Sequence, residues 1–229
     1  MNPFFLYYGG KYRLAQRLGA PRHPHVIEPF GGSCGYSVYW SPPQVAIIER
    51  DPIIFGVWDY LIRTPEREVL ALPIVDCIDE LPAGTCQEGR DLVGFWLNRA
   101  TSEPAKRRSS WARHPDTRYM FWGPQIRWRI ASQLKHIRHW TIRHGDYRQA
   151  PDIEAHWHID PPYVAAGRHY RFGYVGRRAL ADWCKQRKGF VQVCGASGED
   201  YLPFRRFAAL HSHNSARGFS PEAICEFGQ

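Results

Sequence analysis

The consecutive residues Asp160, Pro161, Pro162 and Tyr163 combine an acid, two rigid residues and an aromatic ring. They follow the alternating run 155–159, which predicts a β-strand. Proline holds the preceding residue extended and has no N–H, so we expect a stiff loop with free carbonyl groups. Such a loop suits a planar heterocycle with an exocyclic amine, because the ring can stack while the oxygen acceptors hold the amine hydrogens. Alternatively, the prolines merely end the strand and Tyr163 belongs to the core.

A second segment with chemical potential lies near the N-terminus and reads Tyr7, Tyr8, Gly9, Gly10, Lys11. Two adjacent glycines let the backbone turn and approach a ligand closely. Lys11 places a cation beside that turn. The segment therefore predicts a ligand-binding loop, with an ordinary solvated turn as the alternative.

A third segment joins a strand to a helix through glycines. The apolar run 25–30 predicts a strand that carries Glu28 and Phe30 and leads into Gly31 and Gly32, after which a helix can begin. In α/β folds, a strand, a glycine-rich turn and a helix present the N-terminus of the helix to a nucleotide-like cofactor. The spacing is not that of a dinucleotide-binding motif.

The next predicted strand, 44–49, ends in Glu49, Arg50 and Asp51. An acid at this position suits the two hydroxyl groups of a ribose. Either acid could instead cap the helix that Pro52 begins.

The order of these segments resembles that of the D12 class of S-adenosylmethionine-dependent adenine-N6 DNA methyltransferases, which includes the DNA adenine methyltransferases of bacteria and phages. The matching segments run from about residue 7 to 61 and from about 140 to 174. This chain departs from the family at Cys34, where a third small residue, usually glycine or alanine, is common. The resemblance implies transfer of a methyl group from S-adenosylmethionine to the N6 amine of adenine in DNA, after the base is flipped out of the duplex.

The resemblance also implies a fold and a set of site residues. The fold would be an α/β, Rossmann-like methyltransferase fold with a mixed central sheet flanked by helices. The catalytic core would comprise residues 1–85 and 140–229, with an inserted basic, mostly helical target-recognition region at 86–139. No metal is expected. The expected catalytic residues are Asp160, Pro161, Pro162 and Tyr163. The expected cofactor-binding residues are Tyr7, Gly9, Gly10, Lys11, Glu28, Phe30, Gly31, Gly32, Glu49, Arg50, Asp146, Tyr147 and Asp160.

Positive charge is concentrated in one stretch of the chain. Eleven Lys or Arg residues and two acids lie between Arg99 and Arg143, a net +9 that exceeds the +8 of the whole chain. Such a distribution favours a polyanion-binding insert, with a solvated charge run as the alternative. The predicted helix 124–139 adds a basic face made of Arg127, Arg129, Lys135 and Arg138. The predicted DNA contacts are Lys106, Arg107, Arg108, Trp111, Arg113 and Arg118.

Composition sets the broad class. The chain has 229 residues, of which 44% are hydrophobic, so we expect one globular domain with an insertion. No run of about 18 apolar residues exists, and no basic segment precedes the first apolar stretch, so neither a membrane span nor a secretory signal is expected. Six cysteines without C-x-x-C spacing predict reduced thiols in a cytoplasmic protein, and the resemblance implies that the cell is a bacterium or a phage-infected host. The pairs His156/His158 and His211/His213 leave a metal site open as an alternative.

The remaining segments complete the expected architecture. A glycine- and aromatic-rich loop at 167–176 predicts a lid over the target base, with ordinary packing as the alternative. Residues 73–90 predict a loop. Further helices are expected at 11–19, 52–62, 66–72, 90–100 and 177–188, and further strands at 140–144, 190–194, 206–213 and 222–227.

Two other functions remain open from the sequence. One is a related methyltransferase that acts on RNA or on the N4 amine of cytosine, because loops of the D-P-P-Y kind serve exocyclic amines generally. The other is a nucleic-acid-binding relative that has lost turnover.

Overall fold

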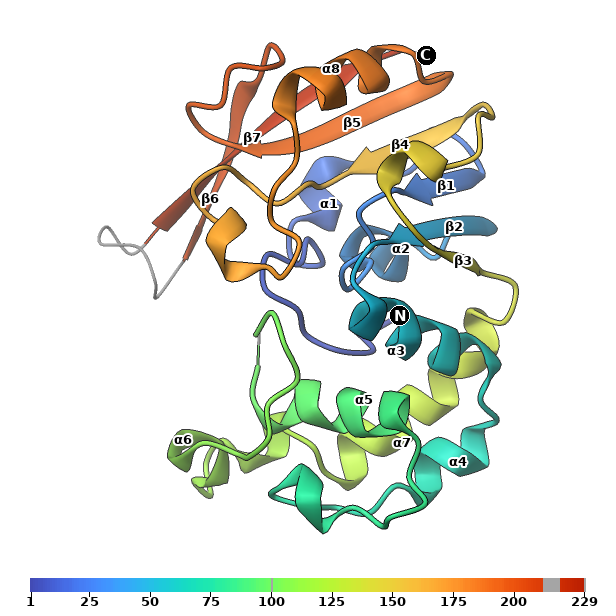
Figure 1. The fold of residues 1–229 in the computed structure, drawn as a ribbon, viewed down its shortest axis with the longest axis vertical. Helices are drawn as coiled ribbons and strands as arrows, with labels where there is room; N and C mark the ends of the chain where they lie inside the picture. Colours follow the sequence, from blue (N-terminus) through green and yellow to red (C-terminus); the bar gives the residue numbers. More distant parts are fainter. Residues whose placement is uncertain (100, 212–218, 229) are drawn as a thin grey trace.

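A seven-stranded mixed sheet forms the centre of the protein in a computed structural model that describes residues 1–99, 101–211 and 219–228 (Figure 1). The strands stand in the order β3-β2-β1-β4-β5-β7-β6; the first five run parallel and β7 is antiparallel to both β5 and β6. Their bounds are β1 (His25–Glu28), β2 (Gln44–Glu49), β3 (Thr141–His144), β4 (Ala155–Ile159), β5 (Gly189–Ala196), β6 (Arg205–His211) and β7 (Phe219–Phe227). This order and the reversed β7 are those of the Rossmann-like methyltransferase fold, so the predicted fold is confirmed.

Helices cover both faces of the sheet because the central strands are apolar on both sides, as expected for parallel strands. On one face, Val45 and Ile47 of β2 pack with α2 (Gly35–Trp40) and α3 (Pro52–Arg63), while α1 (Ala15–Leu18) packs beside Val26 of β1. On the other face, Ile27 and Ile48 share a cluster with α8 (Arg177–Lys185). The alternation between neighbouring residues is that of a strand.

A helical lobe, which we define as residues 66–136, extends from one edge of this core (Figure 1). It contains four α-helices, namely α4 (Glu66–Ala71), α5 (Gln87–Leu97), α6 (Ser110–Arg113) and α7 (Pro124–Gln133). Shorter 3₁₀ helices lie at Ile78–Glu80, Arg118–Met120 and Leu134–His136. The core continues into the lobe through aromatic packing, since the Phe5 ring lies 5.5 Å from that of Trp58 on α3 and 5.1 Å from that of Phe95 on α5.

Several predicted boundaries are wrong. The loop 73–90 contains the 3₁₀ helix Ile78–Glu80 and ends early, because α5 begins at Gln87. The helix at 124–139 ends at Gln133 and tightens into a 3₁₀ turn, as helix ends often do. The helix α6 was not predicted; the Ser109 hydroxyl caps it by accepting from the Ala112 N–H. Residues 212 and 213 of the predicted strand 206–213 lie outside the described residues.

None of the helices in the described part of the chain has the length and apolar character needed to cross a membrane. Within the same residues, no group of three or more His, Cys, Asp or Glu side chains could hold a metal ion. All six cysteines are free thiols, five of them buried and Cys86 exposed. The second histidine of the pair His211/His213 lies outside the described residues.

Candidate active site

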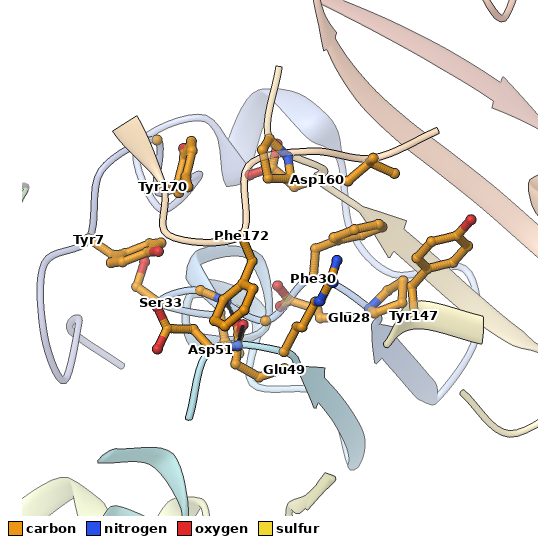
Figure 2. A pocket seen from close by; sticks show the side chains of 18 of the residues that line it. Tyr7, Glu28, Phe30, Ser33, Glu49, Asp51, Tyr147, Asp160, Tyr170 and Phe172 are labelled. Carbon is orange, nitrogen blue, oxygen red and sulfur yellow. Dashed lines mark hydrogen bonds between the residues drawn. The ribbon is translucent and has the colours of Figure 1, made fainter. Parts of the chain in front are cut away.

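A cavity of about 390 Å³ opens at the carboxyl ends of β1, β2 and β4 (Figure 2). Its volume falls within the roughly 300–1,000 Å³ of ligand pockets in proteins. The chain order reverses between β1 and β4, and ligands of open α/β sheets bind at such a switch point. The side chains of Tyr7, Glu49 and Asp160 come from three different segments and line this one space.

Every residue predicted to bind the cofactor lines this cavity, although these residues come from five separate segments of the chain. The five segments hold Tyr7, Gly9, Gly10 and Lys11; Glu28, Phe30, Gly31 and Gly32; Glu49 and Arg50; Asp146 and Tyr147; and Asp160. Residues outside the predicted cofactor set also line it, among them Ser33, His158, Tyr170, Phe172 and Tyr174. His158 was singled out only with His156 as a possible metal pair and not as a residue of this cavity, because a histidine within an apolar strand carries no local signal of a cofactor site.

The N-terminal loop and the glycine-rich turn interlock. A Cβ added at Gly35 would lie 2.4 Å from the backbone nitrogen of Tyr12, and one added at Gly10 would lie 2.7 Å from the Ser33 hydroxyl oxygen. Only glycine allows this approach. Cys34, where the sequence departs from the resembled family, adopts a left-handed conformation with φ +47° and is buried. Cysteine therefore fits the space at a backbone conformation that favours glycine.

Lys11 holds the floor of the cavity together. Its Nζ lies 2.8 Å from Asp160 Oδ1 and 3.8 Å from Glu222 Oε2, and it donates to the Gly9 carbonyl oxygen at 2.8 Å. The Tyr163 hydroxyl donates to Glu222 Oε2 at 2.5 Å. Glu222 was not predicted, because it reaches the site only through the pairing of β7 with β5.

The charges in this network depend on one another. Burial by itself would lower the pKa of Lys11, but the carboxylates of Asp160 and Glu222 outweigh it and raise that pKa, so Lys11 stays protonated. Burial raises the pKa of Asp160, and Lys11 opposes the rise. Burial likewise raises the pKa of Glu222. The amine thus keeps a buried carboxyl pair partly compensated.

Two further acids line the other end of the cavity. Glu49 accepts hydrogen bonds from the backbone N–H groups of Gly32 and Asp51, each at 2.8 Å. Burial raises the pKa of Glu49 to about 7, against the opposing effect of these hydrogen bonds. Glu28 accepts from the Ser37 N–H at 2.8 Å, and burial raises its pKa to about 8. These acids fix the glycine-rich turn. The cavity as a whole is lined by more acidic than basic side chains.

Aromatic rings form the remaining walls. Phe30 stacks on Tyr147 with ring centroids 5.2 Å apart and planes inclined by 25°. From the loop 167–176, Tyr170 donates to the Tyr8 carbonyl oxygen at 3.2 Å, and the Phe172 ring lies 5.2 Å from the Arg50 guanidinium (Figure 2). The predicted lid loop therefore contributes side chains to the cavity wall; whether it moves stays a prediction.

The D-P-P-Y loop divides between the cavity and the protein interior. Asp160 and Pro162 line the cavity, whereas Pro161 and Tyr163 do not. The expectation of free carbonyl groups is wrong at Pro162, because the Arg177 guanidinium donates to that oxygen. The Tyr163 ring lies 4.9 Å from Lys11 Nζ and its hydroxyl is bound to Glu222. The stacking of Tyr163 on a target base stays a prediction.

The residues predicted to bind DNA lie on the helical lobe and none lines the cavity. Lys106, Arg107, Trp111, Arg113 and Arg118 are exposed. Arg108 is the exception, and its prediction as a DNA contact is wrong. It is only 7% exposed, donates to the carbonyl groups of Val75 and Trp122, and pairs with Asp76.

The basic face predicted for helix 124–139 is also partly internal. Arg127 donates to the Leu72 carbonyl oxygen at 2.7 Å, and Arg138 donates to the Ile62 carbonyl oxygen at 2.6 Å. Arg127 thus ties α7 to the end of α4, and Arg138 ties the segment after α7 to the end of α3, so the donors of both are partly used within the protein. Arg129 and Lys135 make no such carbonyl contacts among the described residues.

No protein-family model matches the chain, and no curated protein sequence matches it. Solved structures do match. PH0793 of Pyrococcus horikoshii, described provisionally as a transferase, is 12% identical at a TM-score of 0.39, over 96% of this chain and 63% of that protein. TYW2 of P. horikoshii, solved in complex with MeSAdo, is 12% identical at a TM-score of 0.37, over 100% of this chain and 65% of that protein. The chain thus spans slightly less than two thirds of either protein, and its strand order, rather than these distant similarities, identifies the fold.

Proposed function

We propose that this chain is a methyltransferase that transfers the methyl group of S-adenosylmethionine to the N6 amine of adenine in DNA. One observation carries the proposal: the motif residues of the N-terminal loop, the glycine-rich turn, the end of β2 and the D-P-P-Y loop surround one cavity. The carboxyl ends of neighbouring parallel strands meet at one edge of any such sheet, so the weight of this observation lies in the N-terminal loop, which belongs to no strand and yet joins them by placing Lys11 Nζ 2.8 Å from Asp160.

The charge of the cavity fits a cationic nucleoside cofactor. Five acids line it against three basic side chains; the acids are Glu28, Glu49, Asp51, Asp146 and Asp160, and the bases are Lys11, Arg50 and Arg148. Because burial raises the pKa of Glu28 and of Glu49, both carboxyls gain from a nearby cation. When bound, the cofactor supplies an electrophilic methyl group on a cationic sulfur.

Individual residues suit the parts of such a cofactor. Glu49, at the tip of β2, would face the ribose hydroxyl groups. Phe30 and Tyr147 offer flat rings beside Asp146 for the adenine end. The glycine-rich turn would take the amino-acid end, near the carboxyl of Glu28. These assignments stay proposals until a complex is solved.

Asp160 would hold the target amine. Its carboxylate is fixed by Lys11 at 2.8 Å, so an acceptor oxygen is oriented before substrate arrives. Accepting a hydrogen bond from the amine draws the nitrogen lone pair out of the ring and toward the methyl group, which favours the transition state. As the N–C bond forms and the C–S bond breaks, one amine proton leaves, and Asp160 is positioned to accept it.

The helical lobe would bind the nucleic acid, with residues 86–139 as the target-recognition region. Lys106, Arg107, Arg113 and Arg118 would neutralise phosphates, and the exposed ring of Trp111 would add a stacking surface. A flipped base would then reach Asp160 at a cost of a few kcal/mol for unstacking.

The test is incubation of the protein with methyl-labelled cofactor and either DNA or RNA, followed by nucleoside analysis. We expect label in N6-methyladenine from DNA. Asp160→Asn should lower the methylation rate by about 10³-fold while leaving nucleic-acid affinity within about twofold. The control is Asp152→Asn, which changes an exposed acid outside the cavity.

The outcomes separate the alternatives. Label in RNA alone, or in N4-methylcytosine, would replace the proposed substrate while keeping the site. No cofactor binding by calorimetry, together with intact nucleic-acid binding, would leave only the non-catalytic relative. Wild-type turnover by Asp160→Asn would contradict the role given to that carboxylate.

A further inference from the structure

The D-P-P-Y loop is held in place by two charged side chains that do not line the cavity. The guanidinium of Arg177, the first residue of α8, donates to the Pro162 carbonyl oxygen. Glu199 lies in the segment between β5 and β6, and its Oε1 accepts from the Val164 N–H at 2.7 Å. The two backbone groups stand on either side of Tyr163, so two separate elements fix the same short stretch of backbone.

The same two side chains also lie against each other, and we call the pair the loop clamp. Arg177 Nη2 lies 3.9 Å from Glu199 Oε1, and the guanidinium lies 5.3 Å from the centre of the Tyr201 ring. The side chains of Arg177 and Glu199 are only 18% and 7% exposed. The loop clamp therefore places two opposite charges together in a largely dry setting.

The loop clamp is a poor source of stability. Arg177 Nη1, Glu199 Oε2 and the Tyr201 hydroxyl are buried without a hydrogen-bond partner among the described residues. A buried ion pair repays the loss of hydration only when its geometry is excellent and its remaining polar atoms are satisfied. Unpaired buried polar atoms instead lower stability. Stability of the fold thus does not account for the loop clamp, whereas its contacts with the backbone of the D-P-P-Y loop do.

We propose that Arg177 and Glu199 are positioning residues that hold the D-P-P-Y loop in the geometry needed for methyl transfer. The proposal rests on the proposed function. Because neither side chain lines the cavity, they act through the loop rather than on the substrate. The ring of each proline fixes φ, so the backbone between Asp160 and Val164 has few free torsions. Holding it at the Pro162 carbonyl and the Val164 N–H therefore limits where the Asp160 carboxylate can lie.

The loop clamp also joins the D-P-P-Y loop to the lid loop. Arg177 directly follows the lid loop, and Gly176 at the end of that loop lines the cavity, as Pro162 does. Glu28 and Glu49, proposed for the cofactor, belong instead to β1 and β2. Loss of the loop clamp should therefore displace Asp160 from the target amine and slow the chemical step, while the cofactor stays bound.

The experiment compares the double variant Arg177→Met with Glu199→Leu against the wild type, both as the full chain. Removal of both charges leaves no unpaired ion, so the urea midpoint of unfolding should equal or exceed that of the wild type. The maximal rate of methyl transfer, kcat, should fall about 100-fold, because a displacement of about 1 Å at the reacting groups costs that much. KM for the nucleic acid and the calorimetric Kd for the cofactor should stay within about twofold.

A conservative variant and a matched control separate positioning from folding. Glu199→Gln keeps an acceptor for the Val164 N–H, so its kcat should recover to within about fivefold of the wild type, whereas Glu199→Leu should not recover. The control is Arg187→Met with Asp152→Asn, which removes a second arginine–acid pair, 3.3 Å apart, outside the D-P-P-Y loop and the cavity. Its kcat should equal that of the wild type.

Hydrogen exchange tests the hold on the loop without relying on activity. In the wild type the Val164 N–H is bound to Glu199, so its exchange should be roughly tenfold faster in the double variant. The amides of β4, such as that of Trp157, should exchange as in the wild type, because the sheet does not depend on the loop clamp.

The outcomes separate this proposal from the proposed function. A double variant with kcat within about twofold of the wild type, or with a raised KM alone, would overturn the loop clamp and keep the methyltransferase. Faster exchange throughout β4, with a lower urea midpoint, would mean that the pair only supports the fold and would also overturn the proposal. If the wild type methylates no nucleic acid, the proposed function fails. Exchange at Val164 then decides, and an unchanged rate in the double variant would overturn the loop clamp.

Discussion

The cavity and the helical lobe carry opposite charge and handle it differently. In the cavity, acids exceed bases and each named carboxyl is tied down: Glu49 by two N–H groups, Glu28 by Ser37 and Asp160 by Lys11. In the lobe, bases exceed acids, and most of the predicted phosphate contacts stand in solvent. The comparison teaches that charge in the cavity is buried and held in place by hydrogen bonds and an ion pair, whereas most of the predicted phosphate contacts of the lobe are exposed, which is what the proposed cofactor and nucleic-acid sites would each require.

Among substitutions at the cavity, Gly35→Ala should cause the largest loss of stability and of cofactor binding. The added Cβ would meet the backbone nitrogen of Tyr12 at 2.4 Å and that of Lys11 at 2.9 Å, so the N-terminal loop must move. We expect a loss of about 4 kcal/mol in unfolding free energy, measured by urea unfolding, together with loss of cofactor binding. Gly84→Ala is the control, since nothing lies within 4 Å of its added Cβ. Equal stability of the two variants would show that the two motifs do not interlock.

Within the lobe, Arg108→Ala should lower the free energy of unfolding. Two backbone carbonyls would lose a buried donor and the half-exposed Asp76 would lose its ion-pair partner, so we expect a loss of about 2–3 kcal/mol in unfolding free energy. The adjacent Arg107→Ala should cost no more than about 0.5 kcal/mol, because that side chain is exposed. Nucleic-acid binding should instead respond more to Arg107→Ala. A larger loss of unfolding free energy for Arg107→Ala than for Arg108→Ala in thermal unfolding would contradict the burial of Arg108.

These two neighbours show what the sequence could and could not predict. Lys11, Glu28, Glu49 and Asp160 stand at strand ends or glycine turns, and local patterns are enough to find them. Arg107 and Arg108 are the same residue type one position apart, and only packing against Val75 and Trp122 decides which is buried.

Residues that reach the site through long-range pairing were missed for the same reason. Glu222 arrives by the antiparallel pairing of β7 with β5, and no motif marks it. The mixed sheet flanked by helices followed from the resemblance, whereas the strand order was not predicted and helix ends such as Gln133 depended on local hydrogen bonding.

The raised pKa of Glu28 should make the free energy of unfolding depend on pH. Burial raises the pKa of Glu28 from 4.5 to about 8, so between these values the folded state binds more protons than the unfolded state, and stability falls as pH rises. Relative to Glu28→Gln, which keeps an acceptor for the Ser37 N–H, the wild type should lose about 2 kcal/mol between pH 6 and pH 8. Thermal unfolding of both proteins measures the difference.

The choice of variant removes other titrations from this comparison. Burial lowers the pKa of His156 and of His158 to about 3, so these side chains make stability rise with pH up to about 6.5, equally in both proteins. Saturating cofactor should flatten the difference, because a bound cation favours the ionised carboxyl. If the stability of the wild type and of Glu28→Gln depended on pH in the same way, Glu28 would not have the raised pKa on which its proposed attraction for the cofactor depends.

The smallest expected effect belongs to the residue that joins the two regions. Arg171 of the lid loop lies 4.0 Å from Asp51 at the cavity and 3.5 Å from Glu103 on the lobe, and in both contacts the arginine side chain is partly exposed to solvent. Exposed pairs of this kind contribute about 0.2–1 kcal/mol each, so Arg171→Ala should weaken cofactor binding by roughly two- to fivefold. The loss should shrink in high salt, since screening already removes most of the attraction. Arg168→Ala on the same loop is the control, because it pairs with no acid among the described residues. A salt-independent loss in Arg171→Ala would mean that packing of Tyr170 and Phe172, rather than charge, couples the cavity to the lobe.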